Sequence, residues 1–212
     1  MRVAAINGSP KPKDSTSAQI IKQIEGLLGE PVETYHAAKL IQSETPIETI
    51  KDILSSDVLL IVFPLYVDSL PAPLIELLTR LEMASRDNAT TPWVFAVTNS
   101  GFFEAEQNTL ALSMIEHFSS HTGLRWGYGI GIGGGGMLAG MGEDWSKGPV
   151  YGIYNALSDM AVAMRDKVSR QNVFVTPNIP RFVYKFAADF GMRRTAKRNG
   201  VKNIRARPYM EQ

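Results

Sequence analysis

The chain has 212 residues, 44% of them hydrophobic, and its 22 basic and 21 acidic residues leave a net charge of +1. This length and composition are enough to bury a full hydrophobic core, most simply in one domain, and no apolar run reaches the roughly eighteen residues of a membrane-spanning helix. The absence of cysteine excludes disulfides, thiolate metal sites, cysteine nucleophiles and Cys-ligated iron–sulfur clusters. Because an apolar segment begins at Val3, we expect no signal peptide and a cytoplasmic location.

The first seventeen residues predict a strand, a polar loop and the start of a helix. Residues 3–6 are apolar, the chain breaks at Asn7-Gly8, and apolar residues recur at helical spacing from Ala18 to Leu28. A helix N-terminus reached in this way offers unpaired amides and the positive end of the helix dipole. Hydroxyls and two lysines add donors and charge, at Ser9, Lys11, Lys13, Ser15, Thr16 and Ser17. We interpret the loop as a phosphate site; an N-capped surface turn is the plainer alternative.

The rest of the chain alternates predicted strands and helices. Strands are expected at 32–36, 58–63, 93–97 and 126–132, and helices from Pro46 to Leu54, through Leu74 to Leu81, at 105–121 and from Pro149 to about Val168. This alternation predicts an α/β fold, a five-stranded, doubly wound parallel sheet of order 2-1-3-4-5 with the strand at 32–36 near an edge. In that arrangement ligands bind beyond the carboxyl ends of the strands, at the switch point between strands 1 and 3.

Two further loops leave the predicted sheet at the same edge. Pro64, Leu65 and Tyr66 follow the third strand, and an Asn-Ser-Gly-Phe-Phe run, residues 99–103, follows the fourth. Aromatic and apolar side chains beside free backbone amides suit a flat heterocycle, although Pro71 and Pro73 also suit a rigid helix entry. Ser100 lacks the G-x-S-x-G context of a hydrolase nucleophile.

Glycines and histidines supply two weaker signals. Gly129, Gly131 and Gly134 match G-x-G-x-x-G, but the predicted helix starts too late for a dinucleotide motif. The ten glycines between Gly127 and Gly148 favour a mobile flap over a ligand or close approach of backbone to ligand, with simple disorder as the alternative. His117 and His121 have a metal-ligand spacing without a third ligand, so we interpret them as surface residues and predict no metal site.

The three loops together resemble the flavodoxin-like NAD(P)H-dependent FMN reductases, and most closely the branch related to iron–sulfur flavoproteins. The resemblance rests on GSPKPKDSTS, FPLYVDSLPAPL and TNSGFF, in that order, and spans about residues 2–168. It implies FMN as cofactor, with the phosphate held by Ser9, Lys11, Ser15, Thr16 and Ser17. It implies that the ring lies among Pro64, Leu65, Tyr66, Asn99, Ser100, Gly101 and Phe102. Lys11 stands where the family often has arginine, which weakens bidentate phosphate contact, and the branch's iron–sulfur cluster cannot form without cysteine.

The implied activity is hydride transfer from NAD(P)H through the flavin to a small electron acceptor, namely a quinone, flavin, nitro- or azo-compound. Because the flavin carries the chemistry, no catalytic side chain is expected. The resemblance also implies a homodimer. Alternatives are a flavodoxin-type electron carrier without turnover of its own, and a binding or sensing protein with a redox-silent site. The carrier is disfavoured because flavodoxin-type carriers are typically strongly acidic, whereas the net charge of this chain is close to zero.

The C-terminal segment differs in charge from the rest. From residue 177 to the end there are nine basic and two acidic residues, so this part carries +7 and the preceding part −6. Phe182, Phe186 and Phe190 recur every four residues, which predicts a basic helix carrying an apolar face. We therefore divide the chain into an FMN-binding domain, 1–176, and a basic helical extension, 177–212. We expect the aromatic face to pack on protein, with an anionic membrane or an acidic partner as alternatives; nucleic acid is not an expected partner.

Overall fold

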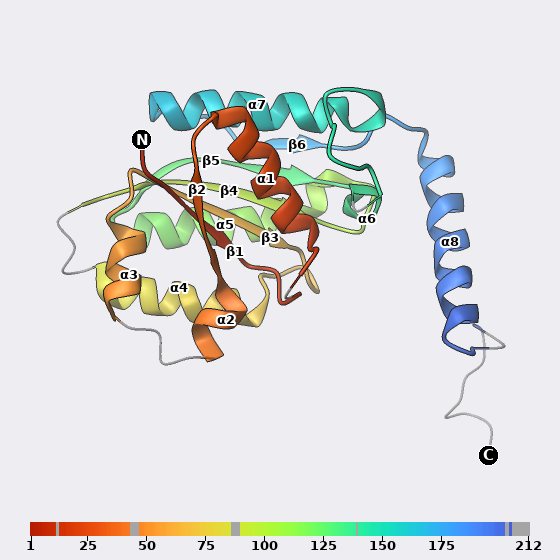
Figure 1. The fold of residues 1–212 in the computed structure, drawn as a ribbon, viewed down its shortest axis with the longest axis horizontal. Coiled ribbons are helices and arrows are strands. Elements are labelled where there is room, and N and C mark those ends of the chain that lie inside the picture. Colours follow the sequence, from red (N-terminus) through yellow and green to blue (C-terminus); the bar gives the residue numbers. More distant parts are fainter. Residues whose placement is uncertain (12, 43–46, 86–89, 139, 202–203, 205–212) are drawn as a thin grey trace, which may run out of the picture. The chain divides into compact units, whose positions relative to one another are not determined.

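The computed structural model describes residues 1–11, 13–42, 47–85, 90–138, 140–201 and 204 (Figure 1). The chain divides into two compact units, Met1–Asn178 and Ile179–Gln212. The first unit contains a parallel sheet of six strands in the order β2-β1-β3-β4-β5-β6. The strands are β1 (Val3–Asn7), β2 (Val32–His36), β3 (Val58–Pro64), β4 (Trp93–Asn99), β5 (Arg125–Ile132) and β6 (Val173–Val175). The predicted parallel α/β sheet and the edge position of β2 are confirmed.

The sheet has one strand more than the five expected from the sequence. β6 pairs in parallel with β5 over three residues, from Ile130 opposite Val173 to Ile132 opposite Val175. A run of three apolar residues is too short for periodicity to distinguish a strand from a loop. β6 is therefore recognised as a strand by its pairing with β5 and could not be predicted from the sequence.

Helices cover both faces of the sheet. They are α1 (Thr16–Leu28), α2 (Ala37–Gln42), α3 (Ile47–Leu54), α4 (Ala72–Ser85), α5 (Thr109–His121), α6 (Gly135–Leu138) and α7 (Tyr151–Asp166), with 3-10 turns at Ala105–Asn108 and Gly148–Val150. α1 and α7 lie on one face, and α3, α4 and α5 lie on the other (Figure 1). The helix predicted from Pro46 is described from Ile47, and Pro46 itself lies outside the described residues. Of the described helices, α2 and the one-turn α6 were not predicted.

The central strands are apolar on both faces because both faces are covered. In β3, Val58, Leu60 and Val62 belong to the core beneath α1 and α7, whereas the alternating Leu59, Ile61 and Phe63 belong to the core beneath α3, α4 and α5. Such strands read as continuous hydrophobic runs in the sequence. Burial of the two layers fixes the register and brings the carboxyl ends of all the strands to one edge.

The glycines of β5 serve packing, which corrects the expectation of a flap for this part of the run. A Cβ at Gly127 would overlap the ring of Phe95, one at Gly129 would lie 2.6 Å from Leu112 Cδ2, and one at Gly131 would lie 2.7 Å from a ring carbon of Phe174. Gly133, just after the strand, lies against the backbone carbonyl of Phe103. The backbone therefore comes close to neighbouring protein groups at these positions.

The second unit contains one described helix, α8 (Arg181–Arg198), and none of its residues is buried. Phe182, Phe186 and Phe190 occupy successive turns of this helix and are all exposed. Within the described ranges, no helix combines the length and the apolar character needed to cross a membrane.

Replacing Gly133 by alanine tests the close approach at the end of β5. The new methyl group would meet the carbonyl oxygen of Phe103, which is backbone and cannot rotate away, so we expect a loss of about 2 kcal/mol in the free energy of unfolding, measured by urea titration. Gly26→Ala is the matched control, because this site on α1 is open and alanine favours a helix by about 0.5–1 kcal/mol. Equal effects of the two variants would contradict the packing described here.

Candidate functional site

The first loop connects β1 to α1 and is organised by short polar side chains. The Asn7 side chain accepts a hydrogen bond from the Ser9 amide at 3.0 Å and donates one to Ser15 Oγ at 3.3 Å. Ser9 Oγ in turn accepts from the Lys11 amide at 3.2 Å. These bonds bring both ends of the loop onto the tip of β1. Asn7 was not among the predicted site residues, and its place directly before Gly8 was the available signal.

The N-terminus of α1 has the features of an anion site. Ser15 is the N-cap, and its hydroxyl accepts from the Ala18 amide at 3.1 Å, so the other amides of the first turn have no partner inside the helix. No acidic residue stands in that first turn. Ser17 is buried, and its hydroxyl has no hydrogen-bond partner. A buried hydroxyl without a partner is costly, and Ser17 stands in the first turn of α1, beside the amides that have no partner inside the helix.

The two lysines of the loop are exposed, at Lys11 and Lys13, while Thr16 is half-buried. Asp14, between the lysines and the cap, adopts a positive φ of 51°, which aspartate tolerates better than most residues. The predicted phosphate residues thus lie on one loop and the first helical turn.

The loops after β1, β3 and β4 are tied together by backbone hydrogen bonds. The Gly8 amide donates to Val62 O at 2.8 Å, and the Leu65 amide donates to Asn99 O at 2.8 Å. Any Cβ at Gly8 would lie 2.8 Å from Phe63 Cβ, so only glycine lets the first loop come this close to β3. The two predicted ring-binding loops therefore share one edge with the phosphate loop.

Asn99 and Ser100 are buried and already hold protein partners. Asn99 Nδ2 donates to Phe63 O at 3.1 Å. The Ser100 amide donates to Ile132 O at 2.9 Å, and Ser100 O accepts from the Gly135 amide at 2.7 Å. These two residues join the tips of β3, β4 and β5, whereas Tyr66, Gly101 and Phe102 are exposed at the edge.

Asn108 is a buried amide that sequence reasoning missed. Its Nδ2 donates to Ala105 O at 2.9 Å and Ile132 O at 3.2 Å, and its Oδ1 accepts from Thr98 Oγ1 at 3.1 Å. It fastens the loop after β4 to the end of β5. Asn108 sits inside a predicted helix among polar neighbours, so its burial could not be foreseen.

Two titratable side chains of the sheet have shifted pKa values. Burial raises the pKa of Tyr128 to about 12 in the core under α7. Nearer the site, His36 pairs with Asn7 in the sheet. Burial, and then the charge of Lys39, lower the pKa of His36, so this imidazole is neutral at pH 7.

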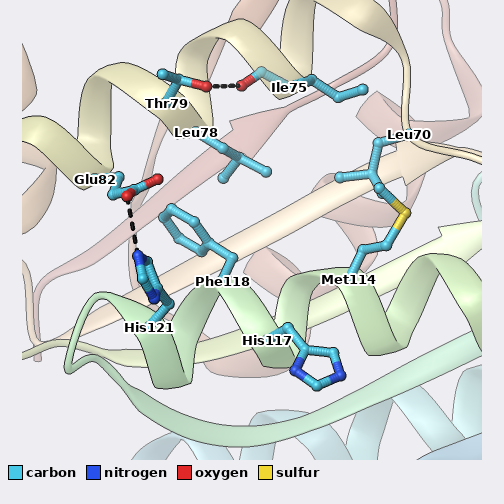
Figure 2. Close-up of a pocket in the computed structure, with 9 residues that line it drawn as sticks. All are labelled: Leu70, Ile75, Leu78, Thr79, Glu82, Met114, His117, Phe118 and His121. Carbon is cyan, nitrogen blue, oxygen red and sulfur yellow. Dashed lines mark hydrogen bonds and ion pairs between the residues drawn. The ribbon is translucent and has the colours of Figure 1, made fainter.

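His117 and His121 lie beside a groove between α4 and α5 (Figure 2). Figure 2 shows His121 reaching Glu82, with 3.2 Å between His121 Nε2 and Glu82 Oε1. Among the described residues there is no group of three histidine, aspartate or glutamate side chains able to hold a metal ion. The remaining lining is mostly apolar.

Comparisons with known proteins agree with this geometry. The family model described as NADPH-dependent FMN reductase matches residues 1–118, which is more than half of the chain. No curated protein sequence matches the chain significantly.

Solved structures share the fold at low sequence identity. An apo NADH:FMN oxidoreductase is 16% identical with a TM-score of 0.60, over 79% of this chain and 90% of that one. A general stress protein 14 from Treponema denticola, in complex with FMN, is 12% identical with a TM-score of 0.57, over 76% and 99%. An FMN-dependent NADH-azoreductase from Bacillus anthracis, also in complex with FMN, is 14% identical with a TM-score of 0.55, over 77% and 99%. With the family match and this shared fold, the chain belongs to the family of NADPH-dependent FMN reductases.

Proposed function

We propose that the chain holds FMN along the carboxyl edge of its sheet and uses NAD(P)H to reduce a small organic acceptor in the cytoplasm. For a quinone, NAD(P)H, a proton and the quinone give NAD(P)⁺ and the hydroquinone. The observation that carries the proposal is the buried, unpartnered hydroxyl of Ser17 in the first turn of α1. The family match supports the same cofactor and donor. The azoreductase and quinone reductase names of similar folds support the acceptor class.

The first loop fits the phosphate of FMN. Ser17 and the free amides of the first turn would donate to phosphate oxygens, and the helix dipole favours the negative charge. Ser15 and Thr16 lie at the same turn, Ser9 closes the loop onto Asn7, and Lys11 supplies positive charge from the exposed side. Lysine acts there as a point charge, without the two-pronged contact of arginine.

The ring end is built from the loops after β3 and β4. Pro64, Leu65 and Tyr66 would line the ring from one loop, and Gly101 and Phe102 from the other. Asn99 and Ser100 would hold these loops at a fixed separation through their internal hydrogen bonds. When bound, FMN supplies the two-electron chemistry, so the side chains are left to orient the ring, exclude water and position both substrates.

An electron carrier is the second candidate, favoured by the −6 charge that residues 1–176 carry, which would suit docking on a basic partner. Purified protein with added FMN separates the candidates. A reductase turns over NAD(P)H steadily with a quinone, and NAD(P)H bleaches its flavin absorbance. A carrier binds FMN without that turnover, and a redox-silent binder shows neither.

Ser17→Ala tests the phosphate assignment in the same protein. Loss of a hydrogen bond to a charged group is expected to weaken FMN binding about ten- to hundredfold, measured by fluorescence quenching of FMN. The free energy of unfolding without FMN should stay equal or rise, because the removed hydroxyl has no partner.

The control is Ser119→Ala on α5, since this buried hydroxyl donates to Ile115 O at 2.9 Å. We expect this variant to lose about 1 kcal/mol of stability and to bind FMN normally. Unchanged FMN affinity in Ser17→Ala would place the phosphate elsewhere.

The α4–α5 surface supports a homodimer. Four exposed apolar residues, Ile75, Met83, Leu110 and Met114, lie on these two helices. Two of them, Ile75 and Met114, line a groove of about 420 Å³ whose walls also include Leu78 and Phe118 (Figure 2). Ser69 Oγ contacts Met114 Sδ at 3.9 Å, so this surface adjoins the loop after β3. Methionine and aliphatic residues with few charges are typical of interface centres.

Charge placed in the groove is expected to separate the subunits. We expect the double variant Ile75→Lys/Met114→Lys to dimerise at least about tenfold more weakly in sedimentation equilibrium, because lysines would be buried without partners. Val162→Lys, on the exposed side of α7, should leave the association unchanged. A wild-type protein that sediments as a monomer would contradict the dimer.

The basic segment is proposed to contact an anionic surface, either a membrane or an acidic protein. Its nine basic residues would attract an anionic surface, and the exposed phenylalanines of α8 would add apolar contact. Co-sedimentation with phosphatidylserine vesicles is expected for the full chain at low salt and not after truncation before residue 177. Absence of sedimentation by the full chain would leave the acidic protein as partner, tested by binding to an acidic peptide.

A further inference from the structure

The loop after β3 contains a tight turn with a backbone conformation that its residues disfavour. The Tyr66 amide donates to Ser69 O at 3.0 Å, and the Ser69 amide donates to Tyr66 O at 3.1 Å. Between them, Val67 has φ 51° and Asp68 has φ 57°. Two hydrogen-bonded residues around two positive φ values define a two-residue turn that normally holds Asn-Gly or Asp-Gly.

Valine is among the least suitable residues for this position. Its branched Cβ is disfavoured at positive φ by contact with the backbone, and such a residue is an uncommon outlier. Val67 also gains nothing from burial, because it is 98% exposed, the largest value for any described large hydrophobic residue. A side chain that strains the backbone and gains nothing from burial points to a contact outside the folded chain.

The surroundings indicate what that contact is. Tyr66, 49% exposed, precedes Val67, and Phe102, 55% exposed, stands on the loop after β4. The hydrogen bond from the Leu65 amide to Asn99 O joins these two loops. The ionisable side chains of residues 67–69 and 99–104 are Asp68 and Glu104, both acidic. The exposed surface of the loops after β3 and β4 is therefore apolar and carries negative charge.

We propose that Val67 and Asp68 select the acceptor: Val67 contacts the face of a neutral, flat aromatic molecule, and Asp68 disfavours anionic ones. This inference rests on the proposed function, since it assumes that the flavin ring lies beside the same loops. Apolar contact made by one valine distinguishes ligands about tenfold. A nearby carboxylate repels an anion by a smaller factor that falls as salt rises.

Val67→Asn tests the apolar contact. With a neutral naphthoquinone we expect KM to rise about tenfold, with kcat and FMN affinity within about twofold of wild type. The urea midpoint should shift upward, because asparagine tolerates positive φ. Val168→Asn is the matched control, an exposed valine whose φ is not positive, and it should change none of these quantities.

Asp68→Asn tests the charge. With a sulfonated naphthoquinone, kcat/KM is expected to rise about threefold at low salt and to converge with wild type near 0.5 M salt, while the neutral quinone is unaffected. Asp159→Asn, an exposed aspartate on α7, is the control.

The outcomes separate this inference from the function beneath it. An active wild-type enzyme with unchanged KM in Val67→Asn, or with FMN affinity lost in that variant, overturns the acceptor contact alone. If Asp68→Asn raises kcat/KM equally for neutral and anionic quinones, the charge selection is overturned. A wild-type protein without FMN binding or NAD(P)H turnover overturns both proposals together.

Discussion

The hydrogen bonds that join neighbouring strand tips are the constraint on which the site depends. Gly8 is bonded to β3, Leu65 to the end of β4, and Ser100 to the end of β5. Each bond is made just beyond a strand, where ordinary sheet pairing stops and loops normally diverge. Because the central strands are parallel and buried on both faces, the two core layers fix their register. The loops therefore leave the sheet side by side, at separations set by the core.

This constraint divides the polar residues of the edge into two groups. Asn7 closes the first loop on itself, and Asn99, Ser100 and Asn108 use their side chains or amides to join neighbouring strand tips. Ser17 and the first amides of α1 remain without protein partners. Polar groups of the first kind order the edge, and groups of the second kind are the ones that the proposed phosphate would engage. A rigid edge lowers the entropic cost of ligand binding, since the loops are ordered beforehand.

The architecture could be predicted from the sequence because its signals are local. Residues 58–63 and 93–97 form continuous apolar runs, and leucines at helical spacing mark α4. The three-residue β6 gives no such signal, and the glycines of β5 gave a misleading one. The packing role of these glycines depends on Phe95, Leu112 and Phe174, which are distant from them in the sequence. For the candidate site, the hydroxyl and aromatic residues that follow the predicted strands were enough to select candidate residues. The partners of Asn108 and the positive φ of Val67 depend on tertiary structure. They could therefore not be predicted from the sequence.

The distribution of charge along the edge gives the proposed cofactor a direction. The first loop carries Lys11 and Lys13 with one acid, Asp14, beside the unpaired amides of α1, whereas the loops after β3 and β4 carry the acids Asp68 and Glu104. A phosphate dianion would be attracted by the lysines and amides of the first loop and repelled by the two acids of the other loops, so FMN bound in reverse would lose favourable charge contacts and gain unfavourable ones. The same asymmetry acts on substrates, because molecules reaching the ring end meet apolar side chains beside carboxylates. Orientation of the cofactor and choice of acceptor would thus follow from one electrostatic gradient along the strand tips.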